Sequence, residues 1–366
     1  MRYFFIIIIL AVTLAFPSFA QEVTVFEEGE GGYAGFRIPA IVKAADGSLL
    51  AFAEARRNGK GDTGDIDLVM KRSCDRGQSW GGMQVVWDDG ENTCGNPAPV
   101  VVGRKIVLPV TWNKGCDREK DIERNASEDT RRVFVLISND SGRTWSEPFE
   151  ITPDVKDESW GWYATGPCHA IVKTRRPARG RIIVPSNHSE LDESGNPVSR
   201  SQLIYSDDRG LTWHLGAVTE VAGNESTVAE LADGSLMLNM RRSSRTDSVR
   251  LYAVSRDGGF SFIGQGRAVS LIDPRCQGSI LSLPDRRGRA TDRLFFSNPA
   301  SRFRRNLSLA QSLDGGMTWE SAAVVCQGPS AYSDIVLIAP GIIGVLYENG
   351  EEGNTYKKIS FRAIPI

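Results

Sequence analysis

The sequence predicts an all-β protein, and within that class a six-bladed β-propeller. An eight-residue turn motif occurs five times, six apolar β-rich runs recur at a regular spacing, and no stretch shows a sustained apolar period of 3.6 residues. These three observations indicate a repeated unit of short strands with little helix. Such a unit is typical of propellers, whose blades are four-stranded sheets. A double β-sandwich is the structural alternative.

The start of the chain has the features of an export signal. A positively charged N-terminus precedes an apolar run over residues 3–16, and small side chains at Ser18 and Ala20 mark a cleavage point after Ala20. We expect residues 1–20 to be a signal peptide and residues 21–366 to form a single domain. The apolar run is short for a spanning helix, so no membrane insertion is expected after signal removal. The expected location is secreted or periplasmic.

Charge and cysteine content narrow the possible partners. Removing the signal takes away only Arg2 and leaves 42 basic against 45 acidic side chains, a net charge of −3. This balance gives no reason to expect nucleic acid or an anionic membrane as a partner. The six cysteines and three histidines show no metal-ligand spacing, so no metal is expected. Export favours some disulfides, with Cys94–Cys116 as one candidate pair. No organic cofactor is implied, and we expect a monomer.

The turn motif reads Ser-x-Asp-x-Gly-x-(Ser/Thr)-(Trp/Phe). Its residue types are those of a hairpin turn: the Asp caps backbone amides, the Gly takes positive φ, and the Ser or Thr adds a local hydrogen bond. We expect the closing aromatic to pack under the turn. The five copies are Ser73–Trp80, Ser138–Trp145, Ser206–Trp213, Ser255–Phe262 and Ser312–Trp319.

The β-rich runs set the number of blades. The six runs are residues 48–53, 105–110, 181–186, 235–240, 293–298 and 341–346, with an average step of about 59 residues. Continuous apolar runs suit strands buried on both faces, and we expect these runs to be the innermost strands. Each run except the last precedes a turn motif. We therefore predict that a strand over Glu22 to Phe26 completes the last blade and closes the ring.

Polar residues that follow the runs are expected to converge on one pocket near the axis. Arginines reach this point from separate runs, and another stands in the stretch Tyr33–Ala40, where Arg37 precedes an Ile-Pro step. The residue before a proline is pushed into the β region, so we expect Ile38 to be extended and Arg37 to be held rigidly. Several converging guanidiniums match a carboxylate. Other polar residues at these run ends are Glu54, Arg56, Trp112, Asn113, Asn187, His188 and Glu348.

The Phe-Arg-Ile-Pro motif, the repeated turn motif (Asp box) and the spaced arginines resemble the sialidase (exo-α-neuraminidase) family of the secreted bacterial type. The resemblance covers residues 22 to 364. It implies an arginine triad at Arg37, Arg241 and Arg304 that binds the substrate carboxylate. The neighbouring arginines that compete for the last two positions are Arg242, Arg302 and Arg305.

The resemblance also implies a tyrosine nucleophile at Tyr332 with Glu225 as its partner, and Glu230 competes for the partner role. A sialic acid carries its carboxylate on the anomeric carbon, which would repel an attacking Asp or Glu but not a neutral phenol. Because a phenol has a pKa near 10, it needs a base within hydrogen-bond reach. Tyr332 read as a core aromatic is the alternative.

The glycine-rich loop over residues 58–67 is expected to supply the acid/base. Family position favours Asp62, with Asp65 and Asp67 as competitors, and a calcium loop is the other reading of this stretch. Arg56 resembles the family's arginine on the C4 side of the sugar. Trp112 is predicted to bind substrate. Other aromatic residues that could cover the sugar's side arms are Trp160, Trp162 and Tyr163.

Together these features predict a retaining exo-α-sialidase that releases terminal α-linked sialic acids from sialylated glycans. A trans-sialidase or an intramolecular (anhydro) sialidase differs only in what attacks the intermediate, and the sequence leaves this open. A non-catalytic sialic-acid-binding propeller is the alternative from another class of protein. It predicts losses among Arg37, Asp62, Glu225 and Tyr332, and all four residue types are present.

Overall fold

The strands pair in groups of four, antiparallel except for one parallel contact between Ile66 and Thr93, and there is very little helix. The computed structural model describes residues 21–242 and 248–366; the expected signal peptide lies outside the described residues. In these ranges the helical segments are η1 (Glu30–Gly32), α1 (Glu119–Ile122) and α2 (Thr152–Val155). The all-β prediction is therefore confirmed.

The first three groups follow one another along the chain. The first contains β2 (Gly35–Lys43), β3 (Leu49–Arg56), β4 (Ile66–Ser73) and β5 (Gln84–Trp87). The second contains β6 (Thr93–Gly95), β7 (Val100–Val102), β8 (Lys105–Asn113), β9 (Arg132–Ser138) and β10 (Phe149–Glu150). The third contains β11 (Tyr163–Thr165), β12 (Ile171–Val172), β13 (Ile182–Leu191), β14 (Pro197–Ser206) and β15 (His214–Val218). In the second group the first strand is divided into β6 and β7, which both pair with β8. In the third group it is divided into β11 and β12, which both pair with β13.

The other three groups complete the ring. The fourth contains β16 (Gly223–Glu230), β17 (Leu236–Arg242), β18 (Val249–Ser255) and β19 (Gly264–Ile272). The fifth contains β20 (Ser279–Ser282), β21 (Leu294–Pro299), β22 (Arg305–Ser312) and the first half of β23 (Glu320–Ala339). The sixth contains the second half of β23, β24 (Ile342–Glu351), β25 (Asn354–Pro365) and β1 (Val23–Glu27).

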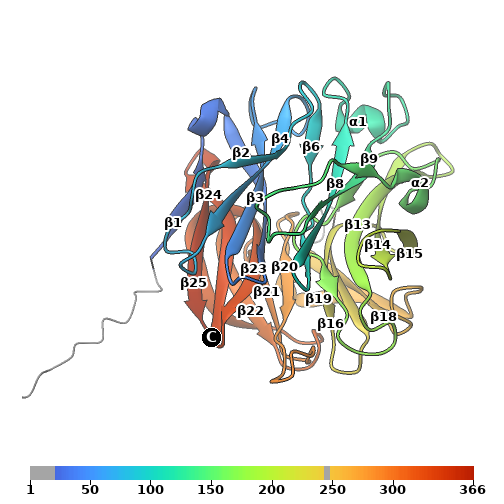
Figure 1. Cartoon of the computed structure of the whole chain (residues 1–366). Helices are drawn as coiled ribbons and strands as arrows, with labels where there is room; N and C mark the ends of the chain where they lie inside the picture. The colour runs from blue at the N-terminus through green and yellow to red at the C-terminus, as the bar shows by residue number, and fades with distance from the viewer. Residues whose placement is uncertain (1–20, 243–247) are drawn as a thin grey trace, which may run out of the picture.

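The first and last strands of the described chain lie side by side. β1 pairs with β25, with Val23 opposite Phe361, so the first strand completes the group that the last strands form (Figure 1). The predicted closing strand is therefore confirmed. Joining the ends in one sheet ties together backbone separated by more than three hundred residues, which removes an exposed edge from the ring.

The apolar cores lie between the groups. One cluster of buried side chains fills each junction between neighbouring groups, and a sixth cluster joins the last group to the first. In that sixth cluster Phe26 and Phe361 pack with Phe36 and Leu49. This arrangement of six groups with six interfaces supports the prediction of six blades.

The β-rich runs correspond to the second strand of each group and not to the innermost one, which corrects the prediction. They become β3, β8, β13, β17, β21 and β24. A second strand is covered on both faces by neighbouring groups, which explains its continuous apolar pattern. The first strands face the axis. Polar, glycine and proline residues such as Pro39 interrupt their apolar pattern, so these strands do not appear as continuous apolar runs in the sequence.

The turn motif has the predicted chemistry in each copy. In the third copy Asp208 Oδ1 accepts hydrogen bonds from Ser206 Oγ (2.8 Å) and Thr212 N (2.9 Å), and Gly210 N donates to Ser206 Oγ (2.8 Å). Trp213 is buried under the turn. The residue before the glycine also has positive φ, 64° for Arg209, which the sequence did not indicate.

Candidate active site

One polar cavity of about 170 Å³ lies at the end of the ring where β3, β13 and β17 finish. Seven of the eight predicted site residues line it, and Trp112 does not. The lining residues are Arg37, Ile38, Glu54, Arg56, Asp62, Asn96, Glu119, Arg131, Trp162, Ala164, Asn187, Asn224, Glu225, Arg241, Arg304 and Tyr332. Side chains from distant parts of the chain therefore meet in one site.

Arg37 is fixed by a carboxylate that the sequence analysis noted without assigning it a role. Its Nε donates to Glu348 Oε1 (2.8 Å) and its Nη2 donates to Glu348 Oε2 (3.2 Å). Glu348 is fully buried and also accepts the backbone N–H groups of Ile38 (2.9 Å) and Tyr332 (3.2 Å). Burial disfavours the guanidinium charge, but Glu348 outweighs it and raises the pKa of Arg37. One carboxylate thus positions both Arg37 and the Tyr332 backbone.

The backbone between Arg37 and Pro39 differs from the prediction. Ile38 has φ of +58°, which is the left-handed region and not the extended conformation expected before a proline. A β-branched residue in this region costs roughly 1–3 kcal/mol. The hydrogen bond from Ile38 N to Glu348 and a register shift in β2 between Arg37 and Ala40 accompany this conformation. A local bulge, rather than a stiff extended strand, therefore aims Arg37.

The other two predicted triad arginines face the same cavity. Arg241 Nη1 donates to Glu225 Oε2 (2.5 Å) and to Tyr332 Oη (2.9 Å). Arg304 Nη1 donates to Tyr356 Oη (2.7 Å), and its guanidinium lies 5.3 Å from the Tyr332 ring centroid. Three guanidiniums on separate strands or loops can therefore reach one planar anion.

The competing residues lie elsewhere. Arg305 pairs with Glu352 at the surface, and the Arg242 backbone N–H donates to Asp273. Neither residue lines the cavity, and neither does Arg302. The choice of Arg241 and Arg304 is the one that the geometry favours.

Tyr332 and Glu225 are in direct hydrogen-bond contact inside the cavity. Tyr332 Oη donates to the Glu225 carboxylate at 2.6 and 2.8 Å from its two oxygens. Burial, followed by the charge of Glu225, raises the pKa of Tyr332 well above its usual value, while Arg241 and Arg304 oppose this rise. The phenol therefore keeps its proton at neutral pH and has a base in direct contact. Tyr332 faces the site and is not a core aromatic.

Glu230, the alternative partner, is at the opposite end of β16. It forms a buried ion pair with Lys173 (2.8 Å) and accepts the backbone N–H of Arg175 (3.0 Å). Its side chain is not among those lining the cavity. Glu225 is therefore the glutamate that the structure brings to Tyr332.

Asp62 stands on the loop after β3, at the edge of the cavity. Its carboxylate lies 2.8 Å from Arg56 Nη1 and 3.7 Å from Arg37 Nη1, and its side chain is 54% exposed. Burial favours the neutral acid, but Arg56 and Arg37 outweigh it and hold the pKa of Asp62 below its usual value. Asp62 is thus an accessible carboxylate in contact with two of the site's arginines.

Arg56 holds the loop that carries Asp62. It is almost fully buried, its Nη2 donates to Glu54 Oε2 (2.6 Å), and its Nη1 donates to the backbone oxygens of Lys60 (2.6 Å) and Gly61 (2.8 Å). The competing aspartates point away from the cavity. Asp65 lies 3.7 Å from Arg57, and Asp67 accepts hydrogen bonds from Arg57 and Tyr33.

Trp112 does not line this cavity, which differs from the prediction that it contacts substrate there. Its indole Nε1 donates to Asp89 (2.7 Å), and its ring packs edge-on against Phe134 and under Arg132. The side chain of Trp112 belongs to the outer surface of β8 because residues alternate along a strand, and Asn113 points inward instead. Of the other proposed aromatics, Trp162 lines the cavity.

Trp160 and Tyr163 have packing roles. Trp160 stacks on His188 with ring centroids 3.4 Å apart, and Tyr163 is fully buried. The interpretation of His188 as structural agrees with this stacking and with its hydrogen bond to Gln202 (2.8 Å). These residues support the wall of the site without reaching the cavity.

The loop between β8 and β9 contributes two cavity residues that the sequence analysis missed. Buried Arg131 donates to Asn96 and Asn113 (2.5 Å each) and lies 3.9 Å above the Trp162 ring. Glu119 begins α1 and faces the same cavity. Burial, together with the charges of Asp62 and Glu123, raises the pKa of Glu119 to about 7. No short motif marks either residue.

A third residue outside the predictions connects two of the arginines. Tyr356 on β25 accepts the hydrogen bond from Arg304, and its ring lies 4.1 Å from the Arg37 guanidinium carbon. A tyrosine ring below a guanidinium stabilises the cation and fixes its plane. Tyr356 therefore links the position of Arg37 to that of Arg304.

All six cysteines are free, so the candidate Cys94–Cys116 disulfide is not present: Cys94 is buried and Cys116 is exposed. Within residues 21–242 and 248–366, no group of three or more His, Cys, Asp or Glu side chains is arranged to hold a metal ion. In the same ranges, no helix has the length and apolar character needed to span a membrane.

The fold and the site define a class of protein: a β-propeller with a cluster of arginines and a tyrosine–glutamate pair on its axis. A family model described as "BNR repeat-like domain" matches residues 47–345. An exo-alpha-sialidase of Aspergillus fumigatus is 31% identical over 360 residues, which cover 91% of this chain and 83% of the relative. A sialidase of Micromonospora viridifaciens is 32% identical over 340 residues, covering 88% of this chain and 51% of the relative.

A solved structure supports the same assignment. A Hadza microbial sialidase superposes with a TM-score of 0.80 at 29% identity, over 94% of this chain and 68% of that one. The chain belongs to the BNR-repeat sialidase family and is a glycoside hydrolase of the neuraminidase type.

Proposed function

We propose that this protein is an exo-α-sialidase that hydrolyses terminal α-linked sialic acids of glycoproteins, glycolipids and oligosaccharides with retention of configuration. The observation that carries this proposal is the contact between Tyr332 Oη and Glu225, 2.6 and 2.8 Å, inside a cavity lined by three arginines. This arrangement supplies a neutral nucleophile, its base and a carboxylate-binding cluster in one place.

The arginine cluster orients the substrate. The carboxylate of a sialoside can accept charge-assisted hydrogen bonds from Arg37, Arg241 and Arg304. These bonds replace the water that surrounds the carboxylate in solution, and the three guanidiniums compensate its negative charge. Glu348 neutralises part of the positive charge of Arg37, so the cluster does not hold the anion too tightly for product release. Because the carboxylate is attached to the anomeric carbon, fixing it also places that carbon near Tyr332.

Tyr332 acts as the nucleophile in the first step. Its Oη bonds to the anomeric carbon as its proton moves to Glu225, while the glycosidic bond breaks and Asp62 gives its proton to the leaving oxygen. The raised pKa of Tyr332 makes this transfer depend on the base, since the free phenolate is not populated at neutral pH. Arg241, 2.9 Å from Tyr332 Oη, stabilises the negative charge that develops there.

The second step reverses these roles. Water attacks the anomeric carbon as Asp62 takes its proton, the bond to Tyr332 breaks, and Glu225 returns its proton to the phenol. Asp62 is ionised in the free site because Arg56 and Arg37 hold its pKa down. A bound substrate carboxylate offsets the charge of Arg37, which raises the pKa of Asp62 and lets it serve as an acid. Half of its side chain surface is open to solvent, as delivery of water requires.

The test is the rate of aglycone release from an aryl α-sialoside, with the anomeric form of the product followed by NMR. We expect initial release of α-sialic acid, and a loss of roughly 10³-fold or more in Tyr332→Phe. Tyr205→Phe, a remote tyrosine variant, should keep the original rate. A 2,7-anhydro product would mean that the protein is an intramolecular sialidase, and a transfer product would mean that it is a trans-sialidase. Sialoside binding without release would contradict the enzyme and leave a binding protein.

We also propose that the mature chain is secreted or periplasmic and begins after Ala20. Fractionation of an expressing cell and N-terminal sequencing of the exported protein test this proposal. A protein that stays in the cytoplasm with residues 1–20 attached would contradict it.

A further inference from the structure

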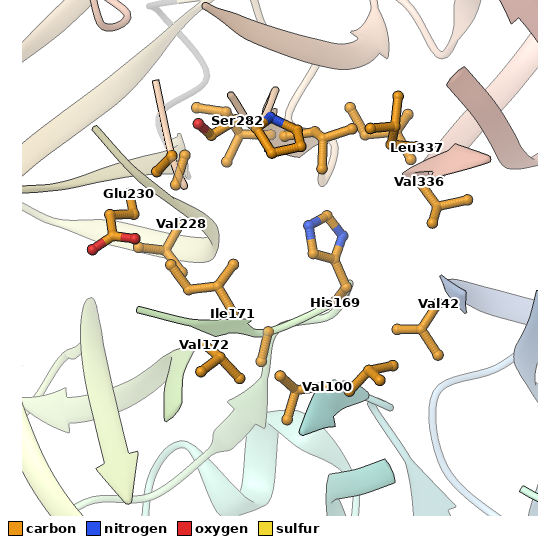
Figure 2. A pocket seen from close by; sticks show the side chains of 18 of the residues that line it. Val42, Val100, His169, Ile171, Val172, Val228, Glu230, Ser282, Val336 and Leu337 are labelled. Atoms are coloured by element: carbon orange, nitrogen blue, oxygen red, sulfur yellow. The ribbon is translucent and has the colours of Figure 1, made fainter. Parts of the chain in front are cut away.

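A second cavity lies on the axis at the opposite end of the ring. It has a volume of about 580 Å³ and is lined by the first strand of each group, β2, β7, β12, β16, β20 and β23. Figure 2 shows aliphatic side chains arranged around it, among them Val42, Val100, Ile171, Val228 and Val336. Ile171 and Val336 are only half-buried, so apolar surface faces the cavity. The volume and lining fit a small-molecule site.

The inner end of this cavity is closed by a histidine–aspartate pair. His169 points into the cavity (Figure 2), and its Nδ1 lies 2.7 Å from Asp334 Oδ1. Asp334 is fully buried and also accepts hydrogen bonds from Ser279 Oγ (2.6 Å) and Ile41 N (2.8 Å). The charge of Asp334 offsets that of a protonated His169, so this end of the cavity has little net attraction for another anion.

The outer end of the cavity is formed by two arginine-rich hairpins, residues 173–181 and 283–293, which we call the arginine rim. Thr174 and Gly288 from these hairpins line the cavity. Arg175 Nε donates to Ala290 O (2.8 Å), and Ala290 N donates to Thr174 Oγ1 (2.9 Å), which joins the hairpins into one surface. The rim is therefore fixed at the cavity mouth.

Part of the positive charge on the arginine rim is not compensated. Lys173, Arg175, Arg181 and Arg289 have carboxylate partners, but four other arginines have none among the described residues. Asp285 accepts hydrogen bonds from the side chain of Arg289 (3.0 Å), so this acid is already engaged. No carboxylate of the described residues lies within 4.0 Å of the exposed guanidiniums of Arg176, Arg179, Arg286 and Arg287. The whole chain has a net charge of −2, so this local excess is a segregation of charge and not a property of the composition.

We propose that this cavity and the arginine rim bind a soluble anionic amphiphile. The aliphatic tail occupies the cavity between the rim and His169, and a phosphate or carboxylate head group contacts the rim arginines. Guanidinium forks match these planar or tetrahedral anions. The opposite orientation is disfavoured because it would bury the anion beside the Asp334 carboxylate. An anionic polymer would use the rim but leave the apolar lining unoccupied.

Calorimetric titration with n-octyl phosphate tests the proposal, with the active site saturated by N-acetylneuraminic acid. Inorganic phosphate carries the charge alone, and n-octyl glucoside carries the tail alone. We expect n-octyl phosphate to bind more than about a hundredfold tighter than inorganic phosphate, since the octyl chain buries apolar surface that inorganic phosphate lacks. It should also bind roughly tenfold tighter than n-octyl glucoside, because two or more guanidiniums contact the head group.

Variants locate the site. Arg286→Ser/Arg287→Ser changes only exposed side chains and should weaken n-octyl phosphate binding by roughly tenfold, down to the level of n-octyl glucoside. Val172→Gln places an amide in the cavity wall and should weaken both octyl ligands. Arg124→Ser, an exposed arginine outside the rim, is the matched control and should change nothing.

Two outcomes would overturn the proposal. Equal affinity for n-octyl phosphate and inorganic phosphate would mean that the cavity does not take the tail. Competition by N-acetylneuraminic acid, with no effect of the Arg286/Arg287 substitutions, would place the ligand in the active site. Sialidase activity is measured separately, so its presence or absence does not decide this test.

Discussion

The two ends of the propeller axis are built from the same strands but have opposite chemistry. At the active-site end, β2, β16 and β23 present Arg37, Glu225 and Tyr332. Four residues or fewer further along, β16 and β23 present Val228 and Val336 to the other cavity. His169 lines the second cavity, and its partner Asp334 lies on β23 between Tyr332 and Val336. The fold therefore fixes where each backbone position lies along the axis. The side chains at those positions decide the chemistry of each end.

The two ends also differ in how a substitution should act. The active-site end holds charges that are paired with one another. Removing one charge leaves its partner without compensation in surroundings of low dielectric constant. The opposite end is mainly aliphatic. Its charged groups are the rim residues, the buried pair Lys173–Glu230, and Lys43, whose Nζ donates to Ile338 O (2.8 Å). Substitutions at the first end should change catalysis, and those at the second end should change stability or the binding of a different ligand.

Among the variants that compare the two ends, Asp62→Asn should have the largest effect. Loss of the acid should lower kcat/KM, which reports the bond-breaking first step, by roughly 10²- to 10⁴-fold on a sialyl-oligosaccharide, but much less on a nitrophenyl sialoside, whose leaving group needs no proton. The 54% exposed side chain contributes little to stability, so the unfolding temperature should stay unchanged. Steady-state kinetics on both substrates measure the difference. Equal losses on the two substrates would contradict the acid role.

Glu348→Gln should damage both stability and substrate binding. Arg37 would keep a buried charge without its carboxylate partner, at a cost of about 3 kcal/mol in the free energy of unfolding. A misplaced Arg37 should also raise KM for the sialoside. Urea unfolding and initial-rate kinetics measure the two effects.

Glu230→Gln is the matched variant at the opposite end. It breaks the buried pair with Lys173, 2.8 Å apart, and should cost a similar ~3 kcal/mol without changing KM. A rise in KM equal to that of Glu348→Gln would show that general loosening of the fold, and not the position of Arg37, controls binding.

The sequence was sufficient for the fold class and for much of the candidate site because both are carried by repeated or local patterns. The turn motif and the spaced runs indicated the ring, and the Phe-Arg-Ile-Pro motif located Arg37. Tyr332, Glu225 and Asp62 meet Arg37 in one cavity, as predicted. The motif alone located Arg37, whereas Tyr332, Glu225 and Asp62 were chosen through the family resemblance.

Features that depend on tertiary contacts could not be predicted in the same way. Ile38 takes positive φ where a buried Glu348 accepts its N–H, and local preference before a proline gives the opposite answer. Arg131 and Glu119 reach the cavity through the long loop before β9, whose path no periodicity specifies. Trp112 follows an apolar run, but strand alternation turns its side chain outward.

Glu119→Gln should change how KM depends on pH at the active-site end. The pKa of Glu119 is raised to about 7, so the side chain gains a negative charge as the pH passes through that value. The added charge, beside Asp62 and only partly offset by Arg131, disfavours an anionic substrate. We expect KM to rise roughly threefold to tenfold above pH 7 in the original protein.

The glutamine variant should lack this rise because its side chain does not ionise. Measurement of kcat/KM from pH 5 to 9 for both proteins checks the prediction, since this ratio reports groups of the free enzyme. If KM rises by the same factor above pH 7 in the variant, the ionisation belongs to another group.

The smallest expected effect concerns the layer between the two cavities. Burial lowers the pKa of His169, but the charge and hydrogen bond of Asp334 outweigh it, so the folded-state pKa lies above the usual value of 6.5. A raised pKa means that the folded state binds the proton more tightly. The stabilisation is therefore complete below pH 6.5 and is lost as the pH rises through the folded-state pKa. Between the two pKa values its slope cannot exceed about 1.4 kcal/mol per pH unit.

His169→Gln tests this sign, because glutamine keeps a hydrogen-bond donor for Asp334 but does not titrate. The difference in unfolding free energy between the original protein and the variant should be largest at pH 5 to 6 and should shrink at higher pH. Urea unfolding at a series of pH values measures it. A difference that grows as the pH rises would mean that His169 is neutral in the folded protein, and the inner end of the apolar cavity would then carry the uncompensated charge of Asp334.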